Sequence, residues 1–186
     1  MHTWAVLILL PPSEKKSPEA GAAIEVYTGV LYAALGWKTL TPSQQKLAQE
    51  SIVIISAKYG AVRPLDPIQP YKEKIVNREI APKVALVLDA IESELIIDCR
   101  SSTYQTVWQS PTEKTIEVKV FTVVDGQKKV ITHMSKKTRG EVTRYILENG
   151  ERIGTPEQLH TIVSRNFTCE LVSASTKEPW VLEVYC

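Results

Sequence analysis

The chain of 186 residues is 44% hydrophobic and 23% charged, which is typical of a globular protein and excludes the disordered and fibrous classes. Its 22 Lys and Arg residues nearly balance 21 Asp and Glu residues, so binding to nucleic acid would need a local basic patch. Three cysteines without paired short spacing exclude a disulfide framework and a cysteine zinc site.

The length predicts a single domain over residues 1–186, large enough to bury its own core. The cysteine usage predicts a reducing, cytoplasmic location. The apolar stretch at residues 4–10 is too short for a membrane span or a signal peptide. We therefore expect no membrane association, no metal and no cofactor, and the sequence does not indicate an oligomeric state.

The first part of the chain alternates apolar runs with helical signals. Residues 5–10 form a continuous apolar run, which predicts a strand buried on both faces. A short helix is expected at residues 31–35, ended by Gly36. The Thr-Pro-Ser-Gln sequence at residues 41–44 predicts the start of a second helix. Residues 51–56 are rich in β-branched side chains and predict the next buried strand.

The middle of the chain contains a proline-rich segment followed by a third strand. Prolines at positions 64, 67 and 70 exclude regular helix, so residues 63–71 are expected to form an extended, stiff loop. Residues 82–91 have the apolar spacing of a helix. Residues 95–99 are another short apolar run and predict the third buried strand.

A hairpin signal and a long helix follow. The Asp-Gly pair at residues 125–126, flanked by residues 116–124 and 128–132, predicts a β-hairpin. We expect Ser135 to cap a helix that continues to residue 149 and stops at Gly150.

The end of the chain completes an α/β pattern. Thr155 begins another helix, and strands near residues 167–172 and 179–184 predict a C-terminal hairpin. Together the elements predict an α/β fold with one mixed, mostly parallel sheet flanked by helices. In such sheets ligands bind outside the carboxyl ends of the parallel strands.

Each of the three predicted inner strands ends in polar residues. These are Ser13 and Glu14 after the first strand, Lys58 and Tyr59 after the second, and Asp98, Arg100 and Ser101 at the third. If the strands are parallel neighbours, their carboxyl ends meet at one edge of the sheet. The sequence therefore predicts a single polar site at that edge.

Four of these residues are candidate catalytic groups, namely Glu14, Lys58, Asp98 and Arg100. Glu14 either serves as a general acid or base with a pKa raised by partial burial, or it caps a helix or pairs with Lys58. Asp98 either acts in catalysis or forms an internal ion pair with Arg100, because an unpaired carboxylate at the end of an apolar strand is costly. Cys99 lies within the same strand and is expected to be an inert buried thiol.

Tyrosine and arginine side chains near these strand ends are candidate ligand contacts. The tyrosines are Tyr27, Tyr59, Tyr71 and Tyr104. They either stack on or donate hydrogen bonds to a planar ligand, or they do the same within the protein. Arg63 either clamps an anionic ligand or holds its own loop to Asp66.

A cluster of cations surrounds the predicted start of the helix at Ser135. It contains His133, Lys136, Lys137, Arg139 and Arg144. Basic residues at the amino end of a helix oppose its dipole unless an anion is bound there. The alternative is a solvated face on which Glu141 pairs with Lys137. His133 has no carboxylate or Cys partner at ligand spacing, so we do not expect it to bind zinc.

Five segments, in order, resemble the signature segments of the YaaA-like peroxide-stress family. They are residues 9–14 (LLPPSE), 27–32 (YTGVLY), 56–60 (SAKYG), 63–71 (RPLDPIQPY) and 133–140 (HMSKKTRG). Residues 98–104 (DCRSSTY) resemble the equivalent segment in the shorter-motif branch of that family. The resemblance implies a cytoplasmic protein of mixed α/β fold that binds DNA and is associated with limiting iron-driven oxidative damage to it.

Residues from these segments complete the set of candidate ligand contacts. The set is Ser13, Tyr27, Thr28, Gly29, Tyr59, Arg63, Tyr71, Ser101, Tyr104, His133, Lys137 and Arg139. Members of the family usually carry several tens of additional residues between the first two segments, including a helical hairpin expected to grip a DNA backbone. Only residues 15–26 lie there in this chain, so we expect the polar cluster to retain small-molecule or nucleotide chemistry.

Two functions remain open. In the first, the protein binds nucleic acid or a nucleotide-like anionic ligand and protects DNA from peroxide and iron damage, with nucleic-acid contacts from Lys58, Arg63, Lys137, Arg139 and Arg144. In the second, it is an enzyme acting on a small planar anionic or nucleobase-like substrate in a biosynthetic pathway. Glu14 or Asp98 would then move a proton or stabilise charge on a substrate oriented by Arg63, Arg100 and Arg139.

Overall fold

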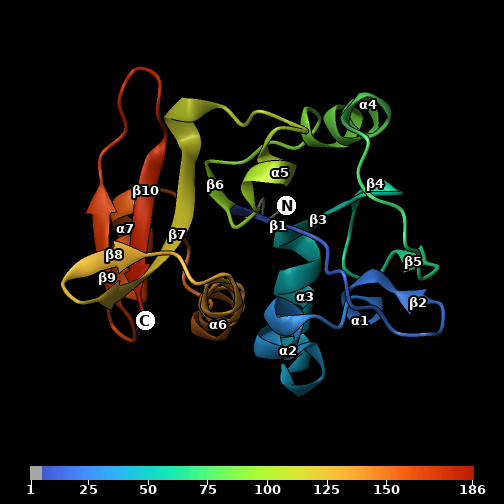
Figure 1. Cartoon of the computed structure of the whole chain (residues 1–186), viewed down its shortest axis with the longest axis horizontal. Coiled ribbons are helices and arrows are strands. Elements are labelled where there is room, and N and C mark those ends of the chain that lie inside the picture. The colour runs from blue at the N-terminus through green and yellow to red at the C-terminus, as the bar shows by residue number, and fades with distance from the viewer. Residues whose placement is uncertain (1–5) are drawn as a thin grey trace.

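The sheet is built around the first predicted strand. The computed structural model describes residues 6–186, so β1 (Val6–Leu10) confirms that strand from Val6 onward, and Ala5 lies outside the described residues. The other strands of the sheet are β3 (Ile52–Ser56), β4 (Gly60–Val62), β6 (Leu95–Asp98), β7 (Thr115–Val124), β8 (Gln127–Lys129), β9 (Thr168–Val172) and β10 (Trp180–Tyr185). Their order is β4-β3-β1-β6-β7-β10-β9, with β8 paired to β7 (Figure 1).

The five inner strands are parallel. β1 pairs with β3 on one side and with β6 on the other, and β7 pairs with both β6 and β10. The edge strands β4 and β9 are antiparallel to their neighbours. The predicted mixed, mostly parallel sheet and the C-terminal hairpin of β9 and β10 are thereby confirmed. Counted along the chain, the parallel strands lie in the doubly wound order 2-1-3-4-5, which places a ligand crevice beside the carboxyl end of the first strand.

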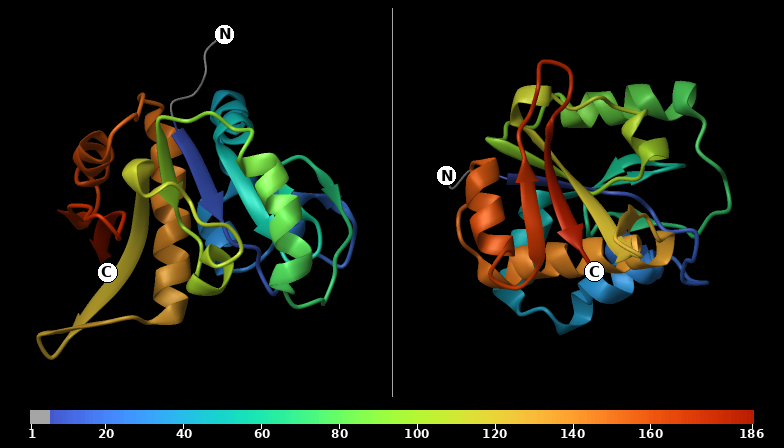
Figure 2. Two further views of the ribbon diagram at one scale, coloured as in Figure 1. Left: turned by 90° about the horizontal axis from the view of Figure 1, so that it is seen from above. Right: turned by 60° about the vertical axis from the view of Figure 1, so that its left-hand side comes forward.

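Helices cover both faces of the sheet (Figure 2). One face packs against α1 (Ala23–Val26), α2 (Val30–Leu35), α3 (Pro42–Ser51), α6 (Thr132–Asn149) and α7 (Pro156–Val163). The other face carries α4 (Asn77–Leu88), with α5 (Ser102–Gln105) beyond the end of β6. A separate two-stranded sheet joins β2 (Gly21–Ala22) to β5 (Pro67–Ile68). Among residues 6–186, no helix combines the length and apolar character needed to cross a membrane.

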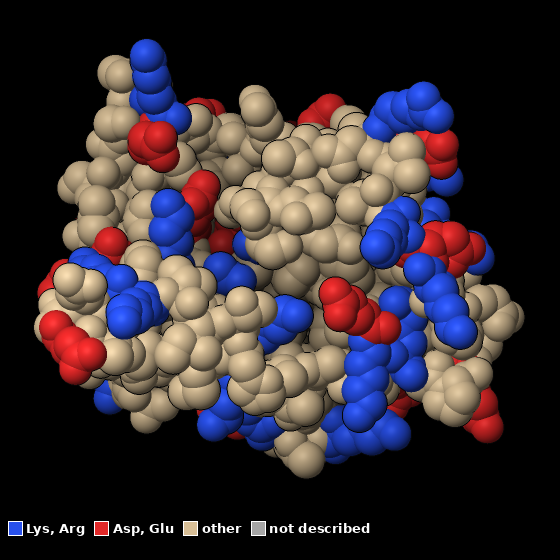
Figure 3. Space-filling model, viewed as in Figure 1, with Lys and Arg blue, Asp and Glu red and all other residues tan. Residues whose placement is uncertain are grey.

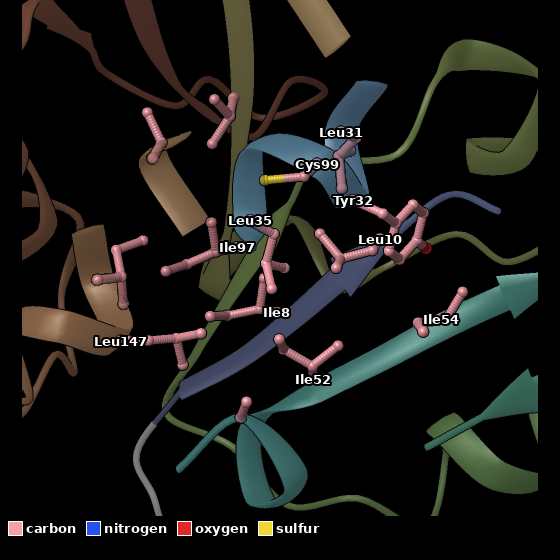
Figure 4. Packing of buried hydrophobic residues seen from close by; sticks show 14 of the residues in the cluster. Ile8, Leu10, Leu31, Tyr32, Leu35, Ile52, Ile54, Ile97, Cys99 and Leu147 are labelled. Carbon is pink, nitrogen blue, oxygen red and sulfur yellow. The ribbon is translucent and has the colours of Figure 1, made fainter. Parts of the chain in front are cut away.

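β1 is apolar along its whole length because helices bury both of its faces. Ile8 and Leu10 belong to the core shared with α2 and α6, whereas Leu7 and Leu9 pack on the side of α4. These four side chains are at most 2% exposed. Figure 4 shows Ile8 and Leu10 among core side chains from β3, β6 and α2. Burial of each such side chain stabilises the fold by about 1.5–3 kcal/mol.

Local signals in the sequence set several boundaries. The N–H of Gln44 donates to the Thr41 hydroxyl, and the N–H of Thr41 donates to the Gln44 side chain, which confirms the predicted capping box of α3. Gly36 ends α2 with a φ of 63°, and Gly150 ends α6 with a φ of 65°, a conformation that glycine adopts without steric cost. Residues 125–126 both have positive φ and form the predicted hairpin turn.

Two helices begin earlier than predicted. α4 starts at Asn77 and includes Pro82, because packing of its apolar face outweighs the one backbone hydrogen bond that a proline removes. α6 starts at Thr132, so the prediction that Ser135 caps it is wrong, and Ser135 is a buried residue inside the helix. Strands β2, β4 and β5 are each two or three residues long, and a pattern that short has no readable period.

Gly140 lies where α6 meets α2. A methyl group there would be 2.2 Å from the carbonyl oxygen of Leu31 and 2.9 Å from the Cβ atom of Ala34. We predict that Gly140→Ala lowers the free energy of unfolding by about 1–3 kcal/mol or more, as measured by urea denaturation. Gly21→Ala is the control, because its added methyl would meet only a Val26 side-chain atom at 3.8 Å. Equal losses in the two variants would contradict the close approach of the helices.

Candidate functional site

A cavity of about 620 Å³ lies at the carboxyl ends of β1, β3 and β6. Its walls include Ser13 and Glu14 after β1, Ala57 after β3, and Ser101 and Tyr104 after β6. The structure therefore brings the ends of the three predicted inner strands together at one edge of the sheet. The strand order indicates a crevice at the same place, because the chain passes from β1 to β3 on one side of it and later to β6 on the other side.

Cations outnumber carboxylates in the walls of this cavity, which we call the cationic cavity. Its charged residues are Lys16, Lys72, Lys74, Lys136 and Arg139 against Glu14 and Glu73. Figure 3 shows Lys and Arg side chains around the middle of this face of the molecule, with acidic side chains beside them. A concave surface lined mainly by one sign of charge raises the local concentration of ions of the opposite sign. The electrostatics therefore favour an anionic ligand.

A buried ion pair joins Asp98, the last residue of β6, to Arg100, and neither side chain lines the cavity. Arg100 donates from Nε to Asp98 Oδ1 at 2.9 Å and from Nη2 to Asp98 Oδ2 at 2.8 Å. Its Nη1 donates to the carbonyl oxygens of Tyr104 and Trp108. Both Asp98 and Arg100 are 2% exposed. The structure thus contains the internal ion pair that was one of the two alternatives for Asp98. The bonds from Arg100 to Tyr104 and Trp108 also hold the segment that follows β6 in place.

A directional chain of hydroxyl groups runs from Ser56, at the end of β3, through Tyr71, which lines the cavity, to Tyr27. Ser56 Oγ accepts the N–H groups of residues 58–59, so its own proton is donated to Tyr71 Oη at 2.9 Å. Tyr71 Oη also accepts the N–H of Ala57, so its proton is donated to Tyr27 Oη at 2.9 Å. Burial raises the pKa of Tyr27, which keeps this phenol neutral. The chain rigidly ties Tyr71 to the end of β3.

Three side chains of the cavity have shifted pKa values, and the hydrogen bond from Lys58 lowers that of Glu73. Lys16 Nζ lies 4.2 Å from the centre of the Tyr71 ring, and partial burial lowers the pKa of Lys16 against the opposing effects of Glu14 and Glu73. Burial raises the pKa of Tyr104 to about 12, with further contributions from Tyr71 and Glu14. Tyr104 therefore keeps its proton at neutral pH and can donate a hydrogen bond into the cavity.

Ser13 lines the cationic cavity, and Thr28 and Gly29 lie beside it, where the segment after β1 meets the start of α2. The Ser13 hydroxyl accepts the N–H of Gly29 at 3.2 Å and donates to the carbonyl oxygen of Lys15. A methyl group on Gly29 would be 2.6 Å from Ser13 Cβ, so only glycine permits this approach. The Thr28 hydroxyl is buried and has no hydrogen-bond partner within residues 6–186.

Other predicted site residues are engaged with the protein. Lys58 pairs with Glu73 at 2.9 Å, and the Tyr59 hydroxyl accepts the N–H of Gln69. Arg63 donates to the carbonyl oxygens of Glu50 and Ile52, whereas Asp66 holds the loop by accepting the backbone N–H of Arg63.

The cations of α6 divide between two faces of the helix. Lys136 and Arg139, three residues apart, both line the cationic cavity, and Arg139 Nε also donates to the carbonyl oxygen of Val118. Lys137 pairs with Glu141 at 3.5 Å on another face, which is the solvated alternative considered from the sequence. Arg144 donates to the carbonyl oxygens that end α2, and His133 is exposed at the start of α6.

Sequence reasoning did not select several residues of the cavity wall. They are Lys16, Lys72, Glu73 and Lys74. All four lie in irregular segments, where no period indicates which side chain points inward. Lys136 belongs to the cation cluster expected at the start of the helix, and its spacing of three from Arg139 places both on one helix face. Within residues 6–186, no group of three or more His, Cys, Asp and Glu side chains is placed to hold a metal ion.

The buried thiol of Cys99 does not line the cavity. Cys99 is 0% exposed, and burial raises its pKa to about 12. At neutral pH the thiol is therefore protonated and out of reach of solvent. This fits the inert role expected from its place in an apolar strand.

Comparison with known proteins gives one consistent family. The model of the family described as peroxide stress protein YaaA matches residues 10–171. A UPF0246 protein of Paraburkholderia xenovorans is 30% identical over 77% of this chain and 64% of the relative. One of Paraburkholderia phytofirmans is 30% identical over 75% and 60%, and one of Burkholderia mallei is 27% identical over 87% and 68%. The chain thus spans less than two thirds of the length of the first two relatives.

Conservative substitutions of Asp98 and of Glu14 should have very different effects on the stability of the fold. We predict that Asp98→Asn lowers the free energy of unfolding by about 3–5 kcal/mol, because it leaves the buried Arg100 guanidinium without its countercharge. Glu14→Gln should change stability by less than about 0.5 kcal/mol, because Glu14 is exposed in the cavity. Urea denaturation of both variants measures the difference, and full stability of Asp98→Asn would contradict a structural role for the ion pair.

Proposed function

The chain belongs to the YaaA peroxide stress protein family, and from this premise we propose that it binds a small anionic ligand in the cationic cavity as part of the response to peroxide. The observation that carries the proposal is the excess of cations in a concave site at the carboxyl ends of three parallel strands. A convex basic surface would favour a polymer instead. A cavity of this volume is in the range that binds small molecules.

The way the other cations are used supports a small ligand over nucleic acid. Four of the five cations expected to contact nucleic acid are Lys58, Arg63, Lys137 and Arg144, and all are held by protein carboxylates or carbonyl oxygens. The fifth, Arg139, lies in the cavity wall. Binding of a phosphate polymer across these residues would require several of these contacts to break, and each would offset part of the gain.

An enzymatic role is the second candidate, and it rests on Glu14. Glu14 is exposed to the cavity, and its charge influences the neutral phenol of Tyr104. A carboxylate and a phenol facing one bound ligand would supply a proton acceptor and a proton donor. Asp98, the other proposed acid or base, lies buried in its pair with Arg100, which makes Glu14 the better candidate.

Removal of a cation from the cavity should weaken anion binding. We predict that Lys136→Ala raises the dissociation constant for pyrophosphate about 10-fold, since a contact between charged groups contributes about 1.5–3 kcal/mol. Lys137→Ala is the matched control, because Lys137 is the next residue on the same helix and pairs with Glu141. Isothermal titration calorimetry measures both variants. Equal effects, or no binding of pyrophosphate by the unmodified chain, would reject the proposal.

Substitution of Glu14 separates binding from catalysis. If the cavity only binds anions, Glu14→Gln should strengthen pyrophosphate binding about 2- to 5-fold, because a negative charge leaves the wall. If Glu14 is a catalytic group, the unmodified chain should convert a member of a nucleoside phosphate panel, as followed by mass spectrometry, and Glu14→Gln should not. Binding of duplex or single-stranded DNA with an affinity that falls steeply with salt would instead favour the nucleic-acid function.

A further inference from the structure

A second hollow adjoins the cationic cavity. It has a volume of about 360 Å³ and lies between the segment after β1 and the start of α2. We call it the side chamber. It shares with the cationic cavity the walls formed by residues 11–14, Leu31 and Lys136. Because the two hollows have these residues in common, they lie next to each other.

The walls of the two hollows differ in chemical character. The residues that line the side chamber but not the cationic cavity include the apolar side chains of Val30 and Ala33. Pro11, Pro12 and Leu31 extend this apolar surface along the shared wall. Lys16, Lys72, Lys74 and Arg139, in contrast, line only the cationic cavity. Lys15 is the exception, because it lines only the side chamber. Most of the cations therefore lie in the cationic cavity, and the side chamber is the more apolar of the two hollows.

Two hydrogen bonds join the walls of the side chamber and fix their spacing. The N–H of Gly29 donates to the Ser13 hydroxyl, and the Tyr32 hydroxyl donates to the carbonyl oxygen of Pro11. Both bonds join α2 and the residue before it to the segment after β1, which form the two walls. A preformed chamber spares a ligand the cost of ordering these segments on binding.

We propose that the side chamber takes the uncharged ring of a ligand whose phosphate or other anionic group lies in the cationic cavity. The inference rests on the proposed function and names its ligand class, a nucleotide or a similar ring-bearing phosphate. An anion without a ring would fill only the cationic cavity. A ring transferred from water to the surface of Pro11, Pro12, Val30 and Ala33 gains from apolar burial. Lys136, present in both walls, marks the junction between ring and anion.

The test compares a ring-bearing phosphate with inorganic phosphate. AMP and inorganic phosphate are titrated calorimetrically into the unmodified chain and into Ala33→Trp, which adds bulk in the side chamber from an exposed position of α2. Val30→Phe fills the chamber from a second position. Ala20→Trp is the matched control, because Ala20 is exposed and lies in the loop before β2. Melting temperatures confirm that each variant is folded.

The expected result is a selective loss. The unmodified chain should bind AMP at least about 10-fold more tightly than inorganic phosphate. Ala33→Trp and Val30→Phe should weaken AMP binding by about 10-fold and leave phosphate binding within about twofold, while Ala20→Trp changes neither. If both probes bind equally, or if the filling variants leave AMP binding intact, the side-chamber inference fails and the proposed anion binding stands. If neither probe binds, both fail.

Discussion

The parallel pairing of β1 with β3 and β6 determines where the functional candidates lie. Leu10 is opposite Ile54 and Leu9 is opposite Asp98, so the three strands end at nearly the same level. Beyond that level the chain turns away from the sheet in three places. Each turn contributes part of the same wall, and the apolar burial that stabilises β1 also fixes the position of the cavity. Stability and site geometry therefore have one origin.

Two buried polar networks lie near the strand ends, and of their side chains Tyr71 lines the cavity wall. Asp98 and Arg100 satisfy each other on one side, and the hydroxyl chain from Ser56 to Tyr27 does so on the other. Unsatisfied groups of this kind would be costly to bury, and fully paired networks make a core rigid. The two networks therefore hold Tyr71 and the turn after β6 in a defined arrangement.

The distribution of cations explains how a chain of almost zero net charge can hold an anion site. Several basic residues are paired on the surface or bonded to carbonyl oxygens at helix and strand ends, as with Arg63 and Arg144. Their charges serve the fold. The lysines and the arginine of the cavity wall face a shared hollow instead. Net charge is therefore a poor guide here, since the local arrangement sets the electrostatic potential.

Sequence alone determined the features that depend on neighbouring residues. The apolar run of β1, the capping box at Thr41 and the turn at residues 125–126 are local, because a strand face, a helix cap and a positive φ are each decided within a few residues. The sequence also predicted that Glu14 and Ser101 meet, on the condition that their strands are parallel neighbours, whereas Lys58 and Arg100 do not line the cavity. Only the tertiary structure decided that α6 begins at Thr132, that Arg63 turns toward Glu50, and that Lys16 and Lys136 face the cavity. Those outcomes depend on packing and on partners distant in the chain, and no local pattern of residues encodes them.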